Sequence, residues 1–518
     1  MTHWIILPVI LPAILAPFIV LAARYHIGIQ RVLSLAGVLG LICVAAGLAW
    51  QASDSTVTLY QLGDWAAPFG IVLVADRLST MMVLLTAVLA FFVLLYAVGS
   101  GWDDRGRHFH ALYQFQLMGI MGAFLTGDLF NLFVFFEVLL IASYGLMIHA
   151  GGNERLRAGV QYVLLNLLGS TLFLFALGAI YAETGTLNMA DLAARVQLID
   201  PDATVGIRVA AVLLLLVFAI KAAVVPLHFW LPSSYAEAPA PVAALFAIMT
   251  KVGAYAIIRV YTLVFHPELE VTDGLHDVWL LPAALISLGI GAVGILAAKK
   301  LDRLVAFAVI GSMGMVMVAI SLFTPVSIAA ALYYMIHSTL AAAALFLIVD
   351  LTRSGRDSLT LEEAAPPVSG AVLTSAMFFV AAIAMTGLPP LSGFVGKLMI
   401  LDASFQSSWA VWAWAVILSA SLISVVGFGR AGSTLFWKAK SVVPPEDTEP
   451  AAAPAPMAYV AVGGLVALLI AHTVFAGQMH RFTIATAAQL FAPTAYVETV
   501  LETPGKLSKP KEGEDDGY

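Results

Sequence analysis

The fold is decided by the stretch of sequence at residues 127–146, GDLFNLFVFFEVLLIASYGL. It is long and apolar enough to cross a lipid bilayer as a helix, which takes about 20 such residues. Near its middle it carries one carboxylate, Glu137. A charge at the centre of a membrane helix costs about 2.5–3.5 kcal/mol on insertion scales. The stretch therefore predicts a transmembrane helix that keeps an expensive polar group for a function.

The composition extends this interpretation to the whole chain. Of its 518 residues, 61% are hydrophobic and 11% are charged, whereas a soluble protein carries about 25% charged residues. So little polar surface indicates a polytopic membrane protein. The net charge of −7 comes with no basic stripe, which argues against nucleic-acid binding. The single cysteine, Cys43, excludes an intramolecular disulfide and a cysteine-based metal cluster.

Apolar segments predict an all-α fold of about fourteen transmembrane helices. The segments are 4–23, 32–50, 77–98, 111–127, 129–149, 158–182, 207–230, 240–264, 278–298, 303–323, 326–349, 370–403, 409–437 and 456–476. We interpret the first as a retained span, because no basic segment precedes it and it is too long for a signal peptide. Prolines interrupt two spans, around Pro226 and Pro232 and at residues 386–390.

The loops predict the orientation. With the N-terminus outside, thirteen lysines and arginines lie in inside loops and seven lie outside, so the positive-inside bias places both termini outside the cell (plasma) membrane. Residues 55–75 are too polar to span, and their alternation around an Ala-Pro-Phe-Gly turn predicts an outside β-hairpin. We expect residues 441–455 to form an inside linker and residues 503–518 to be disordered.

The spans group into two blocks of five helices. The predicted parts are N-terminal helices with the hairpin (1–110), a first five-helix repeat (111–264), a second (278–437), a linker (438–455), a last helix (456–476) and a tail (477–518). The fourth helix of each block is broken; Lys221 precedes the first break and Lys397 follows the second. Such a reversal predicts inverted repeats, which place ion sites at the membrane midplane.

Three lysines, Lys221, Lys251 and Lys397, fall well inside predicted spans. Burial without a partner favours the neutral amine, and a nearby carboxylate favours the ammonium. A Glu–Lys pair whose separation changes can therefore bind and release a proton, and Glu137 with Lys221 is the predicted pair. The alternative for each charge is a structural ion pair or a lysine that reaches the interface, although intramembrane charges usually mark ion or proton routes.

Histidine is a second candidate proton carrier. His337 lies in mid-span, and imidazole titrates near neutral pH, although a lone histidine is more often a packing residue. The residues predicted to support the path are His228, Tyr333, Ser338 and Thr339. His228 follows Lys221 by seven residues and shares its helical face if the helix continues past Pro226.

Two glycine-rich motifs look like nucleotide sites but lack the required context. GIGAVG at residues 289–294 lies within a span with no preceding strand, so helix packing through small residues explains it better. SGFVGK at residues 392–397 lacks the first glycine of a phosphate-binding loop. We therefore predict no cofactor, and the sequence places no metal site. Energy must come from an ion gradient or from partner subunits.

Four segments resemble the antiporter-like subunits shared by Mrp-type cation/proton antiporters and respiratory complex I. They are residues 127–146, residues 221–259, YYMIHSTLAAAALFL at 333–347 and TGLPPLSGFVGK at 386–397. The resemblance covers about residues 70–440 and is strongest to the D-type subunit of Mrp antiporters. It implies a mid-membrane proton relay through Glu137, Lys221, Lys251, His337 and Lys397, with half-channels to opposite sides. It also implies a complex with other membrane subunits, among them a larger, homologous A-type subunit.

We therefore predict a proton-translocating subunit of a multisubunit sodium/proton antiporter, which is a transporter component and not an enzyme. One alternative is a proton-pumping subunit of complex I or of a membrane-bound hydrogenase, in which the same residues would act under redox drive. A second alternative is a scaffold that assembles a complex and conducts nothing. The predicted ligands are Na⁺ and H⁺, and the sequence does not locate the Na⁺ site.

Overall fold

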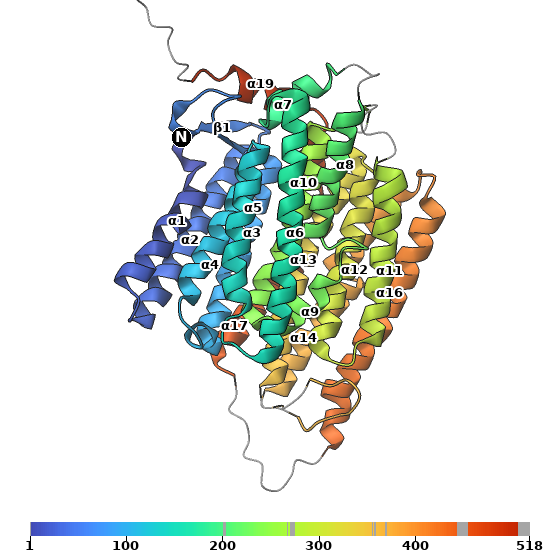
Figure 1. Cartoon of the computed structure of the whole chain (residues 1–518). Helices are drawn as coiled ribbons and strands as arrows, with labels where there is room; N and C mark the ends of the chain where they lie inside the picture. The colour runs from blue at the N-terminus through green and yellow to red at the C-terminus, as the bar shows by residue number, and fades with distance from the viewer. Residues whose placement is uncertain are drawn as a thin grey trace, which may run out of the picture.

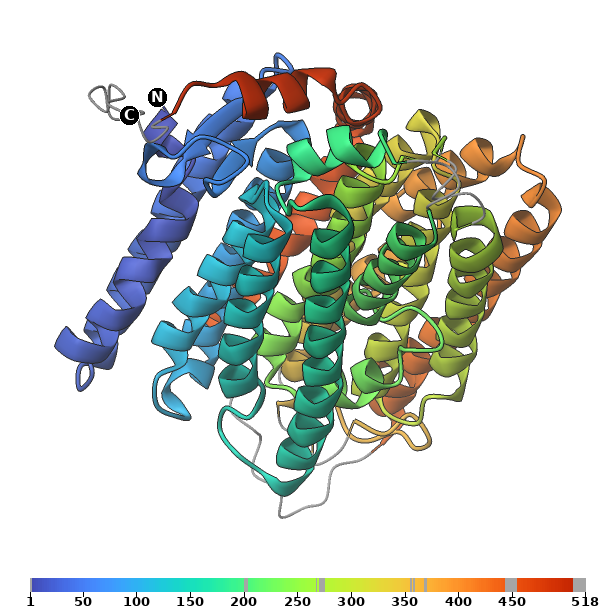
Figure 2. The same ribbon diagram turned by 45° about the horizontal axis from the view of Figure 1, so that its top comes forward.

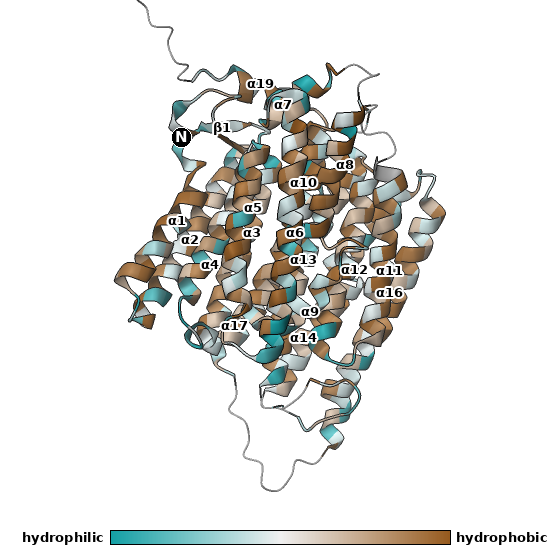
Figure 3. Cartoon of the chain, in the orientation of Figure 1, coloured by the Kyte–Doolittle hydropathy of each residue, from teal (hydrophilic) through white to brown (hydrophobic). Residues whose placement is uncertain are grey.

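The computed structural model describes residues 2–199, 204–266, 268–269, 275–354, 356, 359–367, 370–442 and 454–505. In these ranges the chain forms a bundle of helices, most of which run side by side between two ends of the molecule (Figure 1). Apolar residues dominate the length of the helices, and hydrophilic residues gather toward both ends of the bundle (Figure 3). Such a distribution is what a bilayer requires of a protein that crosses it.

The first half of the bundle precedes the loop after residue 263. Its elements are α1 (Leu7–Ala22), α2 (Ile27–Ala52), β1 (Thr58–Gln61), β2 (Val72–Ala75), α3 (Arg77–Ser100), α4 (Phe109–Leu125), α5 (Leu129–Met147), α6 (Asn153–Thr184), α7 (Met189–Val196), α8 (Val205–Lys221), α9 (Trp230–Glu237) and α10 (Ala240–Leu263). The second half contains α11 (Leu281–Ala297), α12 (Leu301–Ser321), α13 (Pro325–Arg353), α14 (Ala371–Thr386), α15 (Ser392–Ser404), α16 (Ala410–Gly432), α17 (Pro456–Val474), α18 (Ala476–Leu490) and α19 (Thr494–Glu502).

The described residues form ten helices that are long and apolar enough to cross a membrane. The shorter helices α1 and α14 are also apolar. Each predicted span coincides, within a few residues, with one helix or, for 370–403, with the pair α14 and α15. The exception is 207–230, which covers α8 and only the first residue of α9. The prediction of a multi-pass, mainly helical membrane protein is confirmed.

The centre of the bundle is formed by α10, α12 and α13. Their most apolar windows are 100%, 94% and 94% buried, whereas those of α2 and α16 are 33% and 28% buried. Helix α13 explains how this packing is possible, because its run of four alanines at residues 341–344 lets neighbouring helices approach closely. The predicted carriers Lys251 and His337 lie on these central helices.

Both predicted helix breaks exist. Helix α8 ends at Lys221, and α9 begins at Trp230, so the chain between them includes Pro226 as predicted. The prediction that Pro232 also breaks the helix is wrong, because Pro232 lies in the first turn of α9. There its missing amide hydrogen has no intrahelical acceptor to lose. The second break separates α14 from α15 at residues 387–391.

One end of the bundle is closed by the hairpin and by the C-terminal helices. Strands β1 and β2 pair antiparallel with Thr58 opposite Ala75, which confirms the predicted hairpin. Figures 1 and 2 show that α7 and the C-terminal helices lie at the same end. The sequence analysis did not assign α18 and α19 within the predicted tail. The predicted linker residues 443–453 and tail residues 506–518 lie outside the described residues.

Two of the three glycines at residues 289–294, Gly291 and Gly294, serve helix packing as predicted, whereas a Cβ at Gly289 would meet open space. A Cβ atom at Gly291 would lie 2.3 Å from the backbone nitrogen of Gly311, and one at Gly294 would enter the ring of Phe307. Helices α11 and α12 therefore pack with their backbones in close approach.

Candidate functional site

The predicted carriers are buried at positions where helices end, break or pack centrally. Lys221 is 8% exposed, Lys397 is 8% exposed, and Lys251 and His337 are fully buried. Glu137, in the middle of α5, is half-buried. A charge held away from water needs compensating partners, so the contacts of each group decide what it can do.

Lys221 is the last residue of α8, and its ammonium contacts neutral groups. Its Nζ donates to Asn166 Oδ1 over 3.2 Å and lies 5.9 Å from the centre of the Phe136 ring. A neutral amide oxygen stabilises an ammonium less than a carboxylate does. Within the ranges that the structure describes, the lysine therefore has one polar partner and no fixed counter-ion in contact.

The predicted Glu137–Lys221 pair is not a contact ion pair in this structure. No ion pair within 4.0 Å joins the two side chains among the described residues, and the buried Oε1 of Glu137 has no hydrogen-bond partner there. Glu137 is adjacent in sequence to Phe136, whose ring faces the lysine. The two charges are therefore neighbours that the structure holds apart.

A small cavity of about 20 Å³ adjoins Lys221. It is lined by Asn166, Tyr162, Trp230 and Met249 among others. A cavity can hold one water molecule when at least roughly 10–15 Å³ is open to the centre of a water-sized sphere and two or more polar groups line it. The Lys221 ammonium and the Asn166 amide supply those partners, so one water fits beside the lysine.

Lys251 is the most isolated of the three lysines. Its Nζ has no hydrogen-bond partner among the described residues, and neither does the adjacent hydroxyl of Thr250. Across the helix interface, Gln116 of α4 donates to Met249 Sδ over 3.4 Å, and the Oε1 atom of Gln116 has no partner in the described part of the chain. Helix α8 meets α10 at Gly253, where a Cβ would lie 2.7 Å from the backbone nitrogen of Ala222. This close approach brings the end of α8 next to the turn that carries Lys251.

Lys397 lies in α15, directly after the second break. Its Nζ donates to the carbonyl of Thr386 over 2.6 Å and to Ser421 Oγ over 2.9 Å. The carbonyl is free to accept because α14 ends at Thr386. A second cavity of about 20 Å³ adjoins this lysine and includes Ser421 and Ser424 in its lining. Lys397 thus repeats the arrangement of Lys221, with neutral partners and space for one water.

His337 lies between the second break and the central helices. Its Nδ1 is 2.9 Å from Ser392 Oγ, at the start of α15. The charges that act on it belong to Lys251, Lys397 and His472. Lys251 and Lys397, which precede and follow it in the predicted order, are therefore both near enough to act on His337.

His472, at the end of α17, is a site residue that the sequence analysis missed. Its ring stacks on Tyr333 with centroids 4.2 Å apart. Its Nε2 is 3.2 Å from the carbonyl of Tyr333, and the Tyr333 hydroxyl donates to the carbonyl of His472 over 3.3 Å. The available signal was a histidine at the end of an apolar span. Only the packing of α17 on α13 connects it to His337.

The other residues predicted to support the proton path, Ser338, Thr339 and His228, differ in their contacts. The hydroxyls of Ser338 and Thr339 both donate to the carbonyl of Met335 within α13. His228 is half-buried in the break between α8 and α9, and its Nδ1 has no partner among the described residues. Because the helix stops before His228, the helical face expected to connect it with Lys221 does not form.

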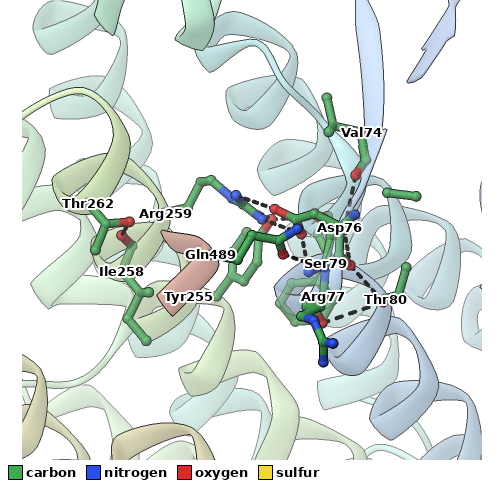
Figure 4. Close-up of polar contacts among 12 residues, drawn as sticks. Val74, Asp76, Arg77, Ser79, Thr80, Tyr255, Ile258, Arg259, Thr262 and Gln489 are labelled. Atoms are coloured by element: carbon green, nitrogen blue, oxygen red, sulfur yellow. Dashed lines mark hydrogen bonds and ion pairs between the residues drawn. The ribbon is translucent and has the colours of Figure 1, made fainter. Parts of the chain in front are cut away.

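A buried ion pair joins α10 to the start of α3, next to the hairpin (Figure 4). Arg259 of α10 contacts both carboxylate oxygens of Asp76, at 2.6 and 2.8 Å, and the two side chains are 4% and 2% exposed. Burial would raise the pKa of Asp76, but Arg259 and the amide and hydroxyl of Ser79 outweigh burial and hold it below its ordinary value. The ring of Tyr496, from α19, lies against the guanidinium. The sequence analysis did not select this pair.

The described residues hold no group of three or more His, Cys, Asp or Glu side chains that could bind a metal ion. The site instead consists of titratable groups on adjacent helices, most of them with neutral partners. Such an arrangement suits proton transfer through side chains and single waters.

Comparison with known proteins agrees with this arrangement. The family model described as NADH:quinone oxidoreductase/Mrp antiporter, transmembrane, matches residues 126–424. The chain belongs to this family. The matched region contains Glu137, the three lysines and His337 and ends before His472.

Two curated relatives are components of antiporters. One is the D-type subunit of a probable K⁺/H⁺ antiporter from Rhizobium meliloti, which is 37% identical over 97% of this chain and 98% of its own length. The other is the D-type subunit of a Na⁺/H⁺ antiporter from Alkalihalophilus pseudofirmus, which is 37% identical over 97% of this chain and 100% of its own length.

Solved structures share the whole fold. A chain of the Mrp complex from Dietzia sp. superposes with a TM-score of 0.86 at 27% identity, covering 97% of this chain and 100% of that chain. A chain of respiratory complex I from Thermus thermophilus gives a TM-score of 0.77 at 26% identity, covering 94% and 99%. The chain is thus a transporter component of the Mrp antiporter and complex I family, as predicted.

Proposed function

We propose that this chain is the D-type subunit of a multisubunit monovalent cation/proton antiporter and that it carries protons at mid-membrane. The observation that carries the proposal is the state of the three buried lysines. Within the described residues none contacts a carboxylate: their partners are an amide, a carbonyl, a hydroxyl or nothing. A buried lysine without a fixed counter-ion can gain and lose its proton as its surroundings change.

The proposed order of the relay is Glu137, Lys221, Lys251, His337 and Lys397. Glu137 controls Lys221, because a carboxylate that approaches the ammonium stabilises it and one that withdraws releases the proton. The gap that now separates them is the withdrawn state of this switch. The cavities beside Lys221 and Lys397 each have room for one water that exchanges a proton with the lysine. His337 connects Lys251 with Lys397.

The membrane topology is part of the same proposal. It comprises fourteen membrane crossings in the plasma membrane, both termini outside, and two inverted five-helix repeats at residues 111–264 and 278–437. Support comes from the two broken helices, α8–α9 and α14–α15, because one carries its lysine before the break and the other after it. The proposed partners are other membrane subunits, among them a larger, homologous A-type subunit.

The exchanged cation is Na⁺ or K⁺. Two relatives of equal identity bear names with different cations, so overall identity does not select between them. The test of function therefore supplies each cation separately.

The redox-driven pump is the alternative with structural support, because the fold is shared with a chain of complex I. Against it, the two relatives with 37% identity over nearly their whole length are both antiporter subunits. The non-conducting scaffold would require the buried charges to be structural pairs, and within the described residues none of the three lysines has such a pair.

Antiport in inverted membrane vesicles tests the proposal. With the complete complex present, we expect Lys221→Ala and Glu137→Ala to lower cation-driven proton movement at least about tenfold, because each removes a member of the relay. Lys299→Ala is the matched control, since this lysine is exposed and pairs with Glu362 on the surface. A blue-native gel must show equal assembly. Wild-type antiport by either relay variant would overturn the proposal, and antiport lost together with assembly would support the scaffold.

A further inference from the structure

A large apolar groove opens on the side of the bundle between α2, α3, α13, α17 and α18. Its volume is about 360 Å³, and its lining includes Leu84, Ile336, Leu468 and Phe482. An engineered cavity of about 150 Å³ already binds benzene, and small-molecule sites begin near 300 Å³. The groove is therefore large enough for a specific ligand.

The lining of the groove favours a hydrocarbon chain, because every lining residue except His472 is apolar. A linear hydrocarbon chain fits such a volume and matches the apolar lining.

One end of the groove is cationic. Arg77 begins α3, and Met81, Leu84 and Val88, which follow it on the same helical face, line the groove. The guanidinium of Arg77 lies 5.3 Å from the ring centre of Phe482, which also lines the groove. It donates to the Ser55 hydroxyl and to the Ser53 carbonyl, both neutral.

Helix α18 adds further polar groups at this end. Arg481, next to Phe482, is exposed, and the buried Nδ1 of the adjacent His480 has no partner among the described residues. Helix α18 contains no acidic residue. The acidic side chain that acts on Arg77 is that of Asp54. Arg77 is only 9% exposed and is acted on by Asp54, so the exposed Arg481 supplies the positive charge that remains for an anionic ligand.

We infer that this groove binds an anionic phospholipid, with one acyl chain in the groove and its phosphate headgroup at Arg481, at the end of the groove where Arg77 lies. Each part of the ligand meets its complement: hydrocarbon meets an apolar wall, and phosphate meets guanidinium groups. The inference does not depend on the proposed antiport, because neither Glu137 nor Lys221 lines the groove.

The groove lies beside two histidines of the bundle, so a bound lipid would change their surroundings. His472 lines the groove and stacks on Tyr333, and Ile336, another lining residue, precedes His337. A bound acyl chain would complete the apolar wall beside these histidines. It would thereby keep water out of this part of the bundle from the lipid side.

Native mass spectrometry of the purified, delipidated complex tests the inference. The complex is titrated with phosphatidylglycerol or with phosphatidylcholine of the same acyl chains. We expect wild type to retain phosphatidylglycerol at least about fivefold better than phosphatidylcholine. Ala49→Trp and Leu84→Trp, which fill the groove from α2 and from α3, should each remove this retention. Arg481→Gln should reduce the preference for the anionic headgroup.

The control is Ala36→Trp, an equal enlargement at an exposed position of α2. It should retain lipid as wild type does, and all variants should share the unfolding midpoint of wild type. Equal retention of both lipids by wild type, or unchanged retention in both groove-filling variants, would overturn the inference. So would a cross-link from Leu84 to another protein of the complex in the native membrane. Using two filling variants keeps the test decisive if one fails to fold.

Discussion

The neutral surroundings of the three buried lysines distinguish this site from a structural charge network. Lys221 and Lys397 have neutral hydrogen-bond partners, and Lys251 has no hydrogen-bond partner within the described part of the chain. By contrast, Arg259 in the same bundle is held by both oxygens of a carboxylate. A fixed counter-ion would lock each lysine in its charged form. The absence of such contacts therefore suits groups that change protonation during a cycle.

Gly387 is the residue that makes the position of Lys397 possible. It has a φ of +75°, and a Cβ there would lie 2.6–2.9 Å from the Lys397 side chain. We expect Gly387→Ala to destabilise the protein by about 1–3 kcal/mol through backbone strain. Displacement of the lysine should also lower antiport several-fold. Thermal unfolding and vesicle antiport measure the two effects.

The matched control is Gly429→Ala in α16, where an added Cβ meets open space. It should leave antiport unchanged and raise helix stability slightly, because alanine favours the helix by about 1 kcal/mol. If the two alanine variants behaved alike, the special role of Gly387 would be disproved.

At the scale of elements, buried ion pairs tie loops to helices at opposite ends of α3. Asp76 caps the start of α3 and pairs with Arg259 of α10. Asp103, just after the end of α3, accepts from Arg31 of α2 at 2.6 Å and lies 3.0 Å from His110 of α4. The pairs Asp76–Arg259 and Asp103–Arg31 join segments distant in sequence, whereas His110 is only seven residues from Asp103. The elements therefore hold one another through charges as well as through packing.

Removing Asp76 should be strongly destabilising. Asp76→Asn leaves the Arg259 guanidinium buried without its counter-ion, which typically costs about 3–5 kcal/mol. The double variant Asp76→Asn/Arg259→Met should recover part of this loss, because no unpaired charge remains. Asp54→Asn, at an exposed position before the hairpin, is the control. A small effect of Asp76→Asn on the unfolding midpoint would contradict the structural importance of the pair.

Asp103 should make stability depend on acid pH. Burial would raise its pKa, but His110 and Arg31 outweigh burial and hold the pKa below its ordinary value. Its stabilisation is therefore complete above the ordinary pKa of about 3.9 and is lost as pH falls through the lower folded value. Asp103→Asn should be less stable than wild type at pH 7. This difference should narrow as pH falls from about 5 toward 3.

Thermal unfolding over this pH range measures the difference. Asp104→Asn, at the exposed neighbouring residue, provides the comparison, and its difference from wild type should stay small throughout. A difference for Asp103→Asn that stayed constant with pH would show that the ionised carboxylate is not the stabilising group.

At the scale of the whole molecule, the hairpin, α7 and the C-terminal helices close the same end of the bundle (Figures 1 and 2). Gln61 of β1 donates to the carbonyl of Thr503, and Gln489 of α18 contacts Arg77 and Ser55. The C-terminal segment is therefore bound to the N-terminal part of the chain. The proposed topology places this end outside the cell.

Cysteine labelling tests this topology, since Cys43 is the single cysteine of the chain. In a Cys43→Ser background, Phe69→Cys in the hairpin should react with an impermeant maleimide applied to intact cells. Lys440→Cys, at the other end, should react only in inverted vesicles. Both side chains are exposed. The expected labelling follows from the positive-inside bias, which places the hairpin outside and Lys440 inside. Reversed labelling would show that the termini are inside.

The sequence by itself determined the helical spans, the hairpin, the second break and the residues that carry charge into the membrane. It could do so because bilayer thickness sets span length and an intramembrane charge is costly wherever it occurs. The prediction that Pro232 breaks a helix was wrong, because a proline in the first turn of a helix and a proline that breaks a helix look alike in sequence. The separation of the Glu137 and Lys221 side chains also cannot be read from the sequence.

Only the tertiary structure decided which side chains meet. His472 reaches Tyr333 from 139 residues away, and Asp76 reaches Arg259 from 183 residues away. The lipid groove likewise combines five helices from both halves of the chain. Such contacts depend on how helices pack against one another, which local periodicity does not encode. Depth in the membrane is a property of each segment, whereas proximity is a property of the fold.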